Sequence, residues 1–492
     1  MSTGSPPGKW TVFGLVAVAV FMSTLDGSIV NIALPILMED YGVTMATVKW
    51  VMMVYLLSVS SLLLSFGRLS DIRGRRWVYF RGFLLFTFGS LLCALAPGIG
   101  WLVSARAIQG AGAAMLMACS PALVVDTFPE NERGRALGAL GTVVAAGLTT
   151  GPAMGGVILH YADWRGIFLL NLPIGLVSAA LAQKWLKGGP GDRRRRESFD
   201  LIGGAALAGG LCFLILAVTK GQQWGLSDPI TLCVSGLATG FIVLLVLRCL
   251  RVDNPVFEPA LLKVRLFLLP AIAAMLLFVC LFSMMFLMPF YLMHPAGYTV
   301  AGAGSMMTVP FVALFFVAPT SGWGFDRIGS SRGICTLGMI LLALSLYLLS
   351  ELTATARPVT IAWRLALAGV GTALFTPPNN SVTMGSISQR FRGVAAATIA
   401  TARNIGMVGG VAMGGLVFNH IFFKASGGEV FSVYRPQFEQ AFMTAFRCAL
   451  GATVGVAVLG AIVSFLRGPE TRRPPSAPGG DDPWGENTGI RK

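Results

Sequence analysis

The chain has 492 residues, of which 55% are hydrophobic and 12% are charged, and its formal net charge is +15. This balance excludes a soluble globular domain. Because the charges form short clusters between long apolar runs, the sequence predicts a polytopic, all-α membrane protein. Most Lys and Arg residues lie in short segments between apolar runs, as topology requires, so no nucleic-acid partner is expected. The eight cysteines show no metal-ligand spacing, and no metal site is predicted.

Fourteen apolar segments are long enough to cross a bilayer. A polar tail (1–9) precedes six of them (10–186), and a basic linker (187–199), expected to contact anionic lipid, follows. Two further segments (200–248), a loop (249–265), six more segments (266–466) and a disordered tail (467–492) complete the chain. The Lys and Arg distribution places both termini in the cytoplasm and the protein in the cell membrane. The predicted helices span about 10–37, 48–67, 78–97, 101–125, 136–159, 165–186, 200–219, 229–248, 266–292, 300–320, 332–350, 359–384, 392–417 and 440–466.

The two sets of six segments share a weak internal repeat. Three residues recur 255 positions later: Gly67, Asp71 and Gly74 return as Gly322, Asp326 and Gly329. Matches in one order at one offset indicate two related halves. Because the offset exceeds a plain six-helix repeat, segments 200–248 are predicted to be inserted between the halves.

Asp26 is the only carboxylate expected deep inside a span. An aspartate in a membrane helix costs about 2.5–3.5 kcal/mol, so it needs a partner, water or a proton. Desolvation favours its neutral form, which suits the loading and release of protons. Arg106 enters the fourth span at a similar depth, so the two side chains can be in contact. The functional hypothesis is a carboxylate that alternates between Arg106 and a proton, and the alternative is a static buried ion pair.

The fifth segment carries an unusual run of small residues. Gly147, Gly151, Gly155 and Gly156 leave one side of this helix almost without side chains, and Pro152 permits a bend. Such a surface allows close contact with another helix. Ordinary small-residue packing is the alternative interpretation.

Four stretches resemble motifs of the fourteen-span drug:proton antiporters of the major facilitator superfamily. They are 25–35 in the first span, 67–76 between the second and third, 106–112 in the fourth and 147–156 in the fifth. The resemblance implies the major facilitator fold, with two six-helix bundles plus two inserted helices. It also implies proton-coupled export of small amphipathic organic compounds by alternating access, with no need for an oligomer. In such an exporter, Asp26 and Arg106 would couple protons and the glycine-rich fifth span would form a kinked seal between the halves.

The resemblance further implies a cytoplasmic latch between the halves. Gly67 and Gly74 would permit close approach and turning, and Asp71 would face the start of a second-half helix near Arg392. Asp326 is its counterpart by the repeat. The other contacts expected of the latch are ion pairs between Arg75 or Arg76 and one of the carboxylates of Asp126, Glu130 and Glu132. The alternative is that these charged residues only set the orientation of the protein in the membrane.

The second half departs from some family exporters because its spans contain no central Asp or Glu. Arg364, Arg403 and Arg447 lie in those spans instead. An electropositive second half disfavours polycationic substrates and suits anionic, zwitterionic or neutral amphiphiles. The candidates for the substrate cavity are Asn31, Asn171, Arg403 and Met285. The alternatives are that Arg403 only hydrogen-bonds backbone carbonyls and that Met285 belongs to a lipid-facing surface.

The sequence lacks a nucleotide-binding loop and a catalytic cluster, and these absences limit the possible energy source and functions. No Gly-x-x-x-x-Gly-Lys-Ser/Thr loop occurs, so no nucleotide cofactor is expected and the proton gradient is expected to drive transport. The nearest alternatives are an importer or facilitator of the same fold, and an exporter of lipid or of one specific metabolite. A membrane enzyme is not supported, because no cluster of residues has catalytic spacing.

Overall fold

The computed structural model describes residues 8–186, 201–224, 228–252, 263–387 and 392–468. The basic linker (187–199), residues 1–7, 253–262 and the tail from 469 lie outside the described residues. The described residues form helices with no β-strand. The first half consists of α1 (Lys9–Asp40), α2 (Met45–Arg73), α3 (Arg75–Ala94), α4 (Ile99–Thr127), α5 (Glu130–Tyr161), α6 (Arg165–Leu169) and α7 (Asn171–Trp185).

The second half follows an inserted pair of helices, α8 (Leu201–Trp224) and α9 (Pro229–Arg251). Thirteen spans of the described residues are long and apolar enough to cross a membrane. The fourteenth predicted span is α8, whose stretch 202–214 is also apolar. The predicted fold class, two six-helix bundles plus an inserted pair, is therefore confirmed. The second half consists of α10 (Arg265–Met293), α11 (Val300–Ile328), α12 (Ser331–Ser350), α13 (Pro358–Gly385), α14 (Arg392–Ala425), the 3-10 turn Pro436–Phe438 and α15 (Glu439–Phe465).

The sixth predicted span is not one continuous helix. It breaks at Leu170 into α6 and α7. Pro173 explains the break, because it has no N–H to donate to the carbonyl of Leu169 and its ring crowds that carbonyl. The break places Asn171 at the first position of α7.

The internal repeat has a structural counterpart at two helix junctions. Gly74 joins α2 to α3 with φ 92°, and Gly329 joins α11 to α12 with φ 76°. Glycine adopts such positive φ values most readily, so both junctions favour glycine, although the two turns differ: ψ is 136° at Gly74 and 5° at Gly329. Gly67 differs, because a Cβ there would lie 4.0 Å from Ala118 Cβ, an ordinary contact. The expectation that Gly67 permits unusually close approach is therefore wrong in this conformation.

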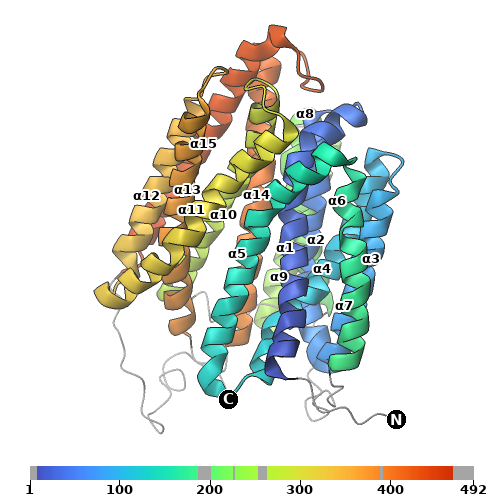
Figure 1. The fold of residues 1–492 in the computed structure, drawn as a ribbon, viewed down its shortest axis with the longest axis vertical. Helices are drawn as coiled ribbons and strands as arrows, with labels where there is room; N and C mark the ends of the chain where they lie inside the picture. The colour runs from blue at the N-terminus through green and yellow to red at the C-terminus, as the bar shows by residue number, and fades with distance from the viewer. Residues whose placement is uncertain (1–7, 187–200, 225–227, 253–262, 388–391, 469–492) are drawn as a thin grey trace.

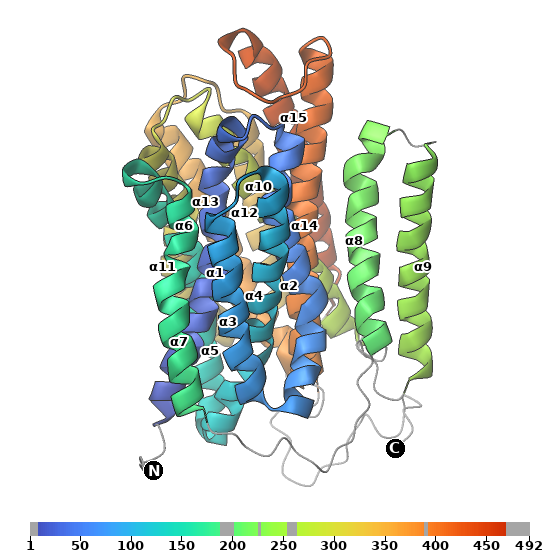
Figure 2. The same ribbon diagram turned by 90° about the vertical axis from the view of Figure 1, so that its right-hand side faces the viewer.

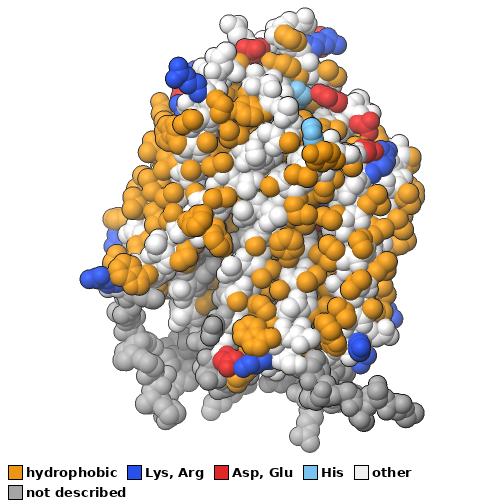
Figure 3. Space-filling model, viewed as in Figure 1, with side chains coloured by type: hydrophobic (Ala, Val, Ile, Leu, Met, Phe, Trp, Pro, Cys, Tyr) orange, Lys and Arg blue, Asp and Glu red, His pale blue; other side chains and the backbone are white. Residues whose placement is uncertain are grey.

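The helices run roughly parallel to the long axis of the molecule, and the inserted pair stands beside the bundle (Figures 1 and 2). We call the end at which α1 begins the proximal end, drawn at the bottom of Figure 1, and the opposite end the distal end. On the face drawn in Figure 3, charged side chains lie toward the two ends and hydrophobic side chains cover the band between them. This distribution matches a bilayer-spanning protein.

The two halves meet at the distal end. Gly304 of α11 packs on α5 so closely that a Cβ there would lie 2.5 Å from Pro152 O and 3.0 Å from Gly156 Cα. Met45 N donates to Phe431 O at 3.1 Å, which joins the start of α2 to the loop before α15. Toward the proximal end, α5 and α11 diverge (Figure 1). The structure is therefore closed distally.

The terminal tail begins later than the sequence predicts. Arg467, assigned to the disordered tail, is fully buried. Its guanidinium donates to Ser331 Oγ at 2.8 Å and to Asn379 Oδ1 at 3.0 Å. The end of α15 is thus fixed to the proximal ends of α12 and α13.

Candidate functional site

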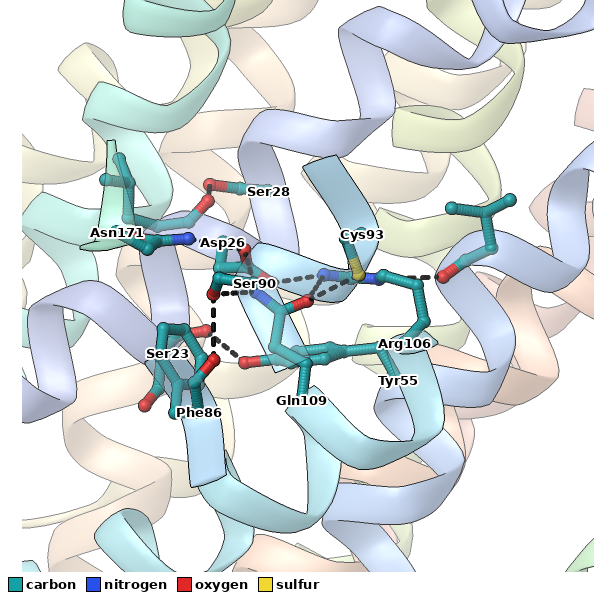
Figure 4. Close-up of polar contacts among 12 residues, drawn as sticks. Ser23, Asp26, Ser28, Tyr55, Phe86, Ser90, Cys93, Arg106, Gln109 and Asn171 are labelled. Carbon is teal, nitrogen blue, oxygen red and sulfur yellow. Dashed lines mark hydrogen bonds and ion pairs between the residues drawn. The ribbon is translucent and has the colours of Figure 1, made fainter. Parts of the chain in front are cut away.

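A buried carboxylate lies inside the first half. Asp26 of α1 and Arg106 of α4 are both fully buried. Arg106 Nη1 donates to Asp26 Oδ2, so the predicted contact between the two residues is present (Figure 4). The pair is surrounded by helices of its own half and does not lie between the halves. What it does in transport remains a prediction.

Two further donors complete the shell of the Asp26 carboxylate. Gln109 Nε2 donates to Asp26 Oδ1 at 2.8 Å, and Asn171 Nδ2 donates to the same oxygen at 3.0 Å (Figure 4). Gln109 Nε2 also lies 2.8 Å from Ser90 Oγ. Three donors from two other helices thus bind this one carboxylate, and they fix its position against α4 and α7.

Arg106 is held from several sides. Its Nε donates to Val51 O at 3.0 Å and its Nη1 to Gln109 Oε1 at 2.6 Å. Its Cζ lies 4.1 Å from the centroid of the Tyr55 ring, and Tyr55 Oη donates to Ser23 O at 2.8 Å. Arg106 Nη2 is buried without a partner among the described residues. A buried donor without a partner is costly, which makes this nitrogen ready to bind an acceptor that enters the site.

Gln109 gives a first prediction. Replacement by Met removes one donor to Asp26 while nearly conserving volume. Because the buried carboxylate loses one of its three donors, the protein should lose about 1.5–3 kcal/mol of stability and uphill transport should slow. Thermal unfolding and uphill transport in proteoliposomes check this.

Cys93→Ser is the control for the Gln109 variant, since the described hydrogen bond of Cys93 goes to the Gln109 oxygen, with Sγ 3.7 Å from Oε1, and not to Asp26. An unchanged melting temperature and transport rate in Gln109→Met would show that Gln109 does not support the Asp26 site.

The glycines of α5 face two different neighbours. A Cβ at Gly147, Gly151 or Gly155 would collide with α1 at Thr24, Ser28 or Ile32, respectively. Only Gly156, together with the carbonyl of Pro152, faces α11 of the other half. The glycine-rich surface therefore mainly packs α5 against the helix that carries Asp26, and it contacts the other half only near its distal end.

The predicted latch residues bind within their own half where their side chains are described. Arg75 Nη1 pairs with Asp126 and also donates to Ala122 O at 3.1 Å. Arg76 donates to Gln183 O, and Glu132 pairs with Lys9 at 2.6 Å. Asp71 and Asp326 lie in α2 and α11, but their side chains lie outside the described set, as does that of Arg392. The contact between halves that the latch requires stays a prediction.

Comparison with known proteins identifies the family. The family model for the Major Facilitator Superfamily matches residues 16–411 and 270–491. The chain belongs to the major facilitator superfamily. It is 33% identical over 404 residues to the riboflavin transporter RibZ of Clostridioides difficile, which covers 82% of this chain and 87% of that protein.

Two other superfamily relatives are named for resistance. The multidrug resistance protein Stp of Mycobacterium tuberculosis is 33% identical over 81% of this chain and 74% of its own length. The methylenomycin A resistance protein of Bacillus subtilis is 30% identical over 83% of this chain and 87% of its own length. A solved bacterial homologue of the human lysosomal transporter Spinster, in an inward-facing conformation, shares the fold with a TM-score of 0.66, 13% identity and coverage of 94% and 98%. The protein is thus a transporter and not an enzyme.

The candidates for the substrate cavity of this superfamily member differ in their surroundings. Asn31 is buried, and both its amide atoms lack a partner among the described residues. Arg403 Nε is also buried without a described partner, and its Cζ lies 5.6 Å from the centroid of the Phe278 ring. Met285 is buried within α10. Asn171 differs from these, because its side-chain amide already donates a hydrogen bond to Asp26.

The other two second-half arginines named from the sequence differ in their pairing. Arg364 donates to Leu348 O, but it forms no ion pair with a carboxylate of the described residues, and its Nε is buried without a described partner. Arg447 pairs with Glu351 at 2.8 Å, and both side chains are exposed. The electropositive character predicted for the second half therefore rests on Arg364 and Arg403.

At the distal end, His294 lies between the halves. Its Nδ1 is 3.9 Å from Glu39 Oε1 of α1, and its ring stacks on Tyr434 at 5.2 Å between centroids. Phe431 and Phe290 pack around it, and its Nε2 has no described partner. Burial lowers the pKa of His294 to about 4. Glu39 and Tyr434 are the titratable groups that face it.

Because burial lowers the pKa of His294, we expect the closure of the distal end to depend on pH. An exposed histidine has a pKa of about 6.5, so opening the distal end raises the pKa of His294. The closed form should be most favoured above about pH 6.5. As the pH falls from there toward 4, the population of the closed form relative to the open form should fall by up to roughly tenfold per pH unit. Distances between spin labels at the distal ends of α5 and α11 check this, after the exposed Cys212, Cys233 and Cys448 are replaced by Ser.

His294→Phe keeps the aromatic packing and removes the titrating group. The distal distance should then lose its dependence on pH between 4 and 6.5. The same slope in wild type and variant would show that another group controls the closure.

Proposed function

We propose that the protein is a proton-coupled exporter of small amphipathic organic compounds, which works by alternating access in the cell membrane with both termini in the cytoplasm. The observation that carries the proposal is the fully buried Asp26–Arg106 pair inside a membrane bundle. A titratable carboxylate at such depth is typical of proton pathways in transporters. The proton gradient drives the exchange without a bound cofactor, and one chain supplies both halves.

Helix α1 is the connection between proton and conformation. It carries Asp26 at its centre, and its distal end presents Glu39 to His294 of the other half. Asp40 Oδ2 accepts from Trp164 Nε1 at 2.9 Å, which ties the same end to the start of α6. Protonation of Asp26 releases Arg106 from the carboxylate and loosens α4 and α7 from α1. We infer that this lets α1 move relative to its own half and weakens the distal closure.

The proposed substrate class is based on the names of the relatives and on the positive charge in the second half. The relatives' names include multidrug resistance, methylenomycin A resistance and riboflavin transport. The unpartnered Arg403 nitrogen disfavours polycations. The second candidate function is transport of one flavin-like metabolite, which the 33% identity to a riboflavin transporter favours.

The test is substrate-induced proton movement in proteoliposomes that contain a pH-sensitive dye. Neutral, anionic and cationic fluorescent amphiphiles and riboflavin are supplied separately under an imposed pH gradient. We expect uphill transport of neutral or anionic compounds, with proton flux in the opposite direction and loss of both on addition of an uncoupler. Transport that ignores the uncoupler would indicate a facilitator. Movement of riboflavin alone would favour the metabolite transporter.

A further inference from the structure

An apolar groove lies on the surface of the second half between α12 and α15. Its volume is about 360 Å³. Thr336 and Ile340 line it from α12, and Val458, Ile462 and Phe465 from α15. Ile340, Val458, Ile462 and Phe465 are each about half exposed, so the groove opens on the outer face of the bundle. In a membrane this face meets lipid chains.

The proximal end of the groove is cationic. The Arg332 guanidinium lies 3.9 Å from the centroid of the Phe465 ring, one helical turn before Thr336. Arg332 Nε is buried without a partner among the described residues. Arg265 Nη2 donates to the carbonyl of Leu466, another residue of the groove wall.

A third guanidinium lies behind these two. Arg467 is fully buried and donates only to neutral groups: Ser464 O, Ser464 Oγ, Ser331 Oγ and Asn379 Oδ1, at 2.8–3.0 Å. None of Arg265, Arg332 and Arg467 forms an ion pair with a carboxylate of the described residues. A buried charge without a counter-ion is costly. An anion at the proximal end of the groove would offset that cost.

We propose that this groove binds an anionic phospholipid. One acyl chain lies along α12 and α15, and the phosphate lies against Arg332 and Arg265. A free phosphate ion would use the cationic end but leave the apolar groove empty, whereas a phospholipid uses both. A zwitterionic headgroup would bring its own cation among three guanidinium groups, so a headgroup with net negative charge is preferred. Basic pockets beside membrane helices bind such headgroups in other proteins.

The headgroup contact is tested with delipidated protein in detergent. Native mass spectrometry counts bound phosphatidylglycerol and phosphatidylcholine of identical chains. We expect one phosphatidylglycerol to bind in preference, and Arg332→Gln to weaken it roughly fivefold. Arg357→Gln, which removes an exposed arginine at the distal end, is the matched control and should leave binding unchanged.

The chain contact has its own pair of variants. Val458→Trp fills the groove, whereas Leu459→Trp alters the next residue of α15, which is equally exposed but does not line the groove. Only Val458→Trp should reduce phosphatidylglycerol binding, and inorganic phosphate should not compete. Equal binding of both lipids, equal binding by all variants, or full competition by inorganic phosphate would overturn the proposal.

Discussion

Asp26→Asn abolishes uphill transport while leaving exchange of substrate across the membrane measurable, if the carboxylate carries the coupled proton. Asparagine fills the same space and cannot titrate. The change also leaves the Arg106 charge buried without its partner, which costs about 3–5 kcal/mol of stability. Loss of transport alone would therefore not separate coupling from damage to the fold.

A second variant separates these two effects. Asp26→Asn combined with Arg106→Gln removes both charges, and replacing a buried pair by neutral groups is often nearly neutral for stability. The double variant should recover most of the melting temperature and still fail to move protons with substrate. Glu351→Gln, which breaks the exposed pair with Arg447, is the control and should cost about 0–1 kcal/mol. Uncoupler-sensitive uphill transport by the double variant would place the proton site elsewhere.

Gly304→Leu should hold the distal end open. The closest approach of the halves there is backbone against backbone, with a Cβ at Gly304 only 2.5 Å from Pro152 O. Backbone atoms cannot rotate away, so the halves must separate. Overpacking of this kind costs about 1–3 kcal/mol, which shifts the population about 5- to 150-fold toward the distally open form. Net transport should fall because the protein no longer completes its cycle.

Gly324→Leu is the control for the Gly304 variant. It lies on the same helix, where an added Cβ meets nothing within 4 Å. Spin-label distances across the distal ends of α5 and α11 distinguish the two variants. A distal distance in Gly304→Leu equal to that in Gly324→Leu would mean that this contact does not limit opening.

The sequence predicted the features that depend on one helix at a time. Apolar length located the spans, and the shared offset of Gly74 and Gly329 located a helix junction with a positive-φ glycine in each half. The depth of Asp26 and Arg106 along their helices showed that the two side chains could be in contact, and the structure has this contact. Gln109 lies within the fourth-span motif (106–112), but no role was predicted for it from the sequence. Its position three residues after Arg106 placed it on the same helix face, and this was the signal.

Features that depend on which helices become neighbours were not predicted. The spacing of the α5 glycines defined a face but could not tell that Gly151 faces α1 and Gly156 faces α11. Asn171 donates to Asp26 because α7 lies against α1, which the sequence did not show. Arg467 looked like the start of a polar tail, because its neutral partners come from helices distant in sequence.

The inserted pair makes the transporter asymmetric toward the bilayer. Helix α8 contacts both α2 of the first half and α14 of the second, so it covers the seam between those helices, while α9 contacts α8 (Figure 2). Among the described residues, no helix covers the opposite seam, between α5 and α11, in this way. We therefore expect a hydrophobic substrate that enters sideways from the lipid phase to do so between α5 and α11, and not between α2 and α14.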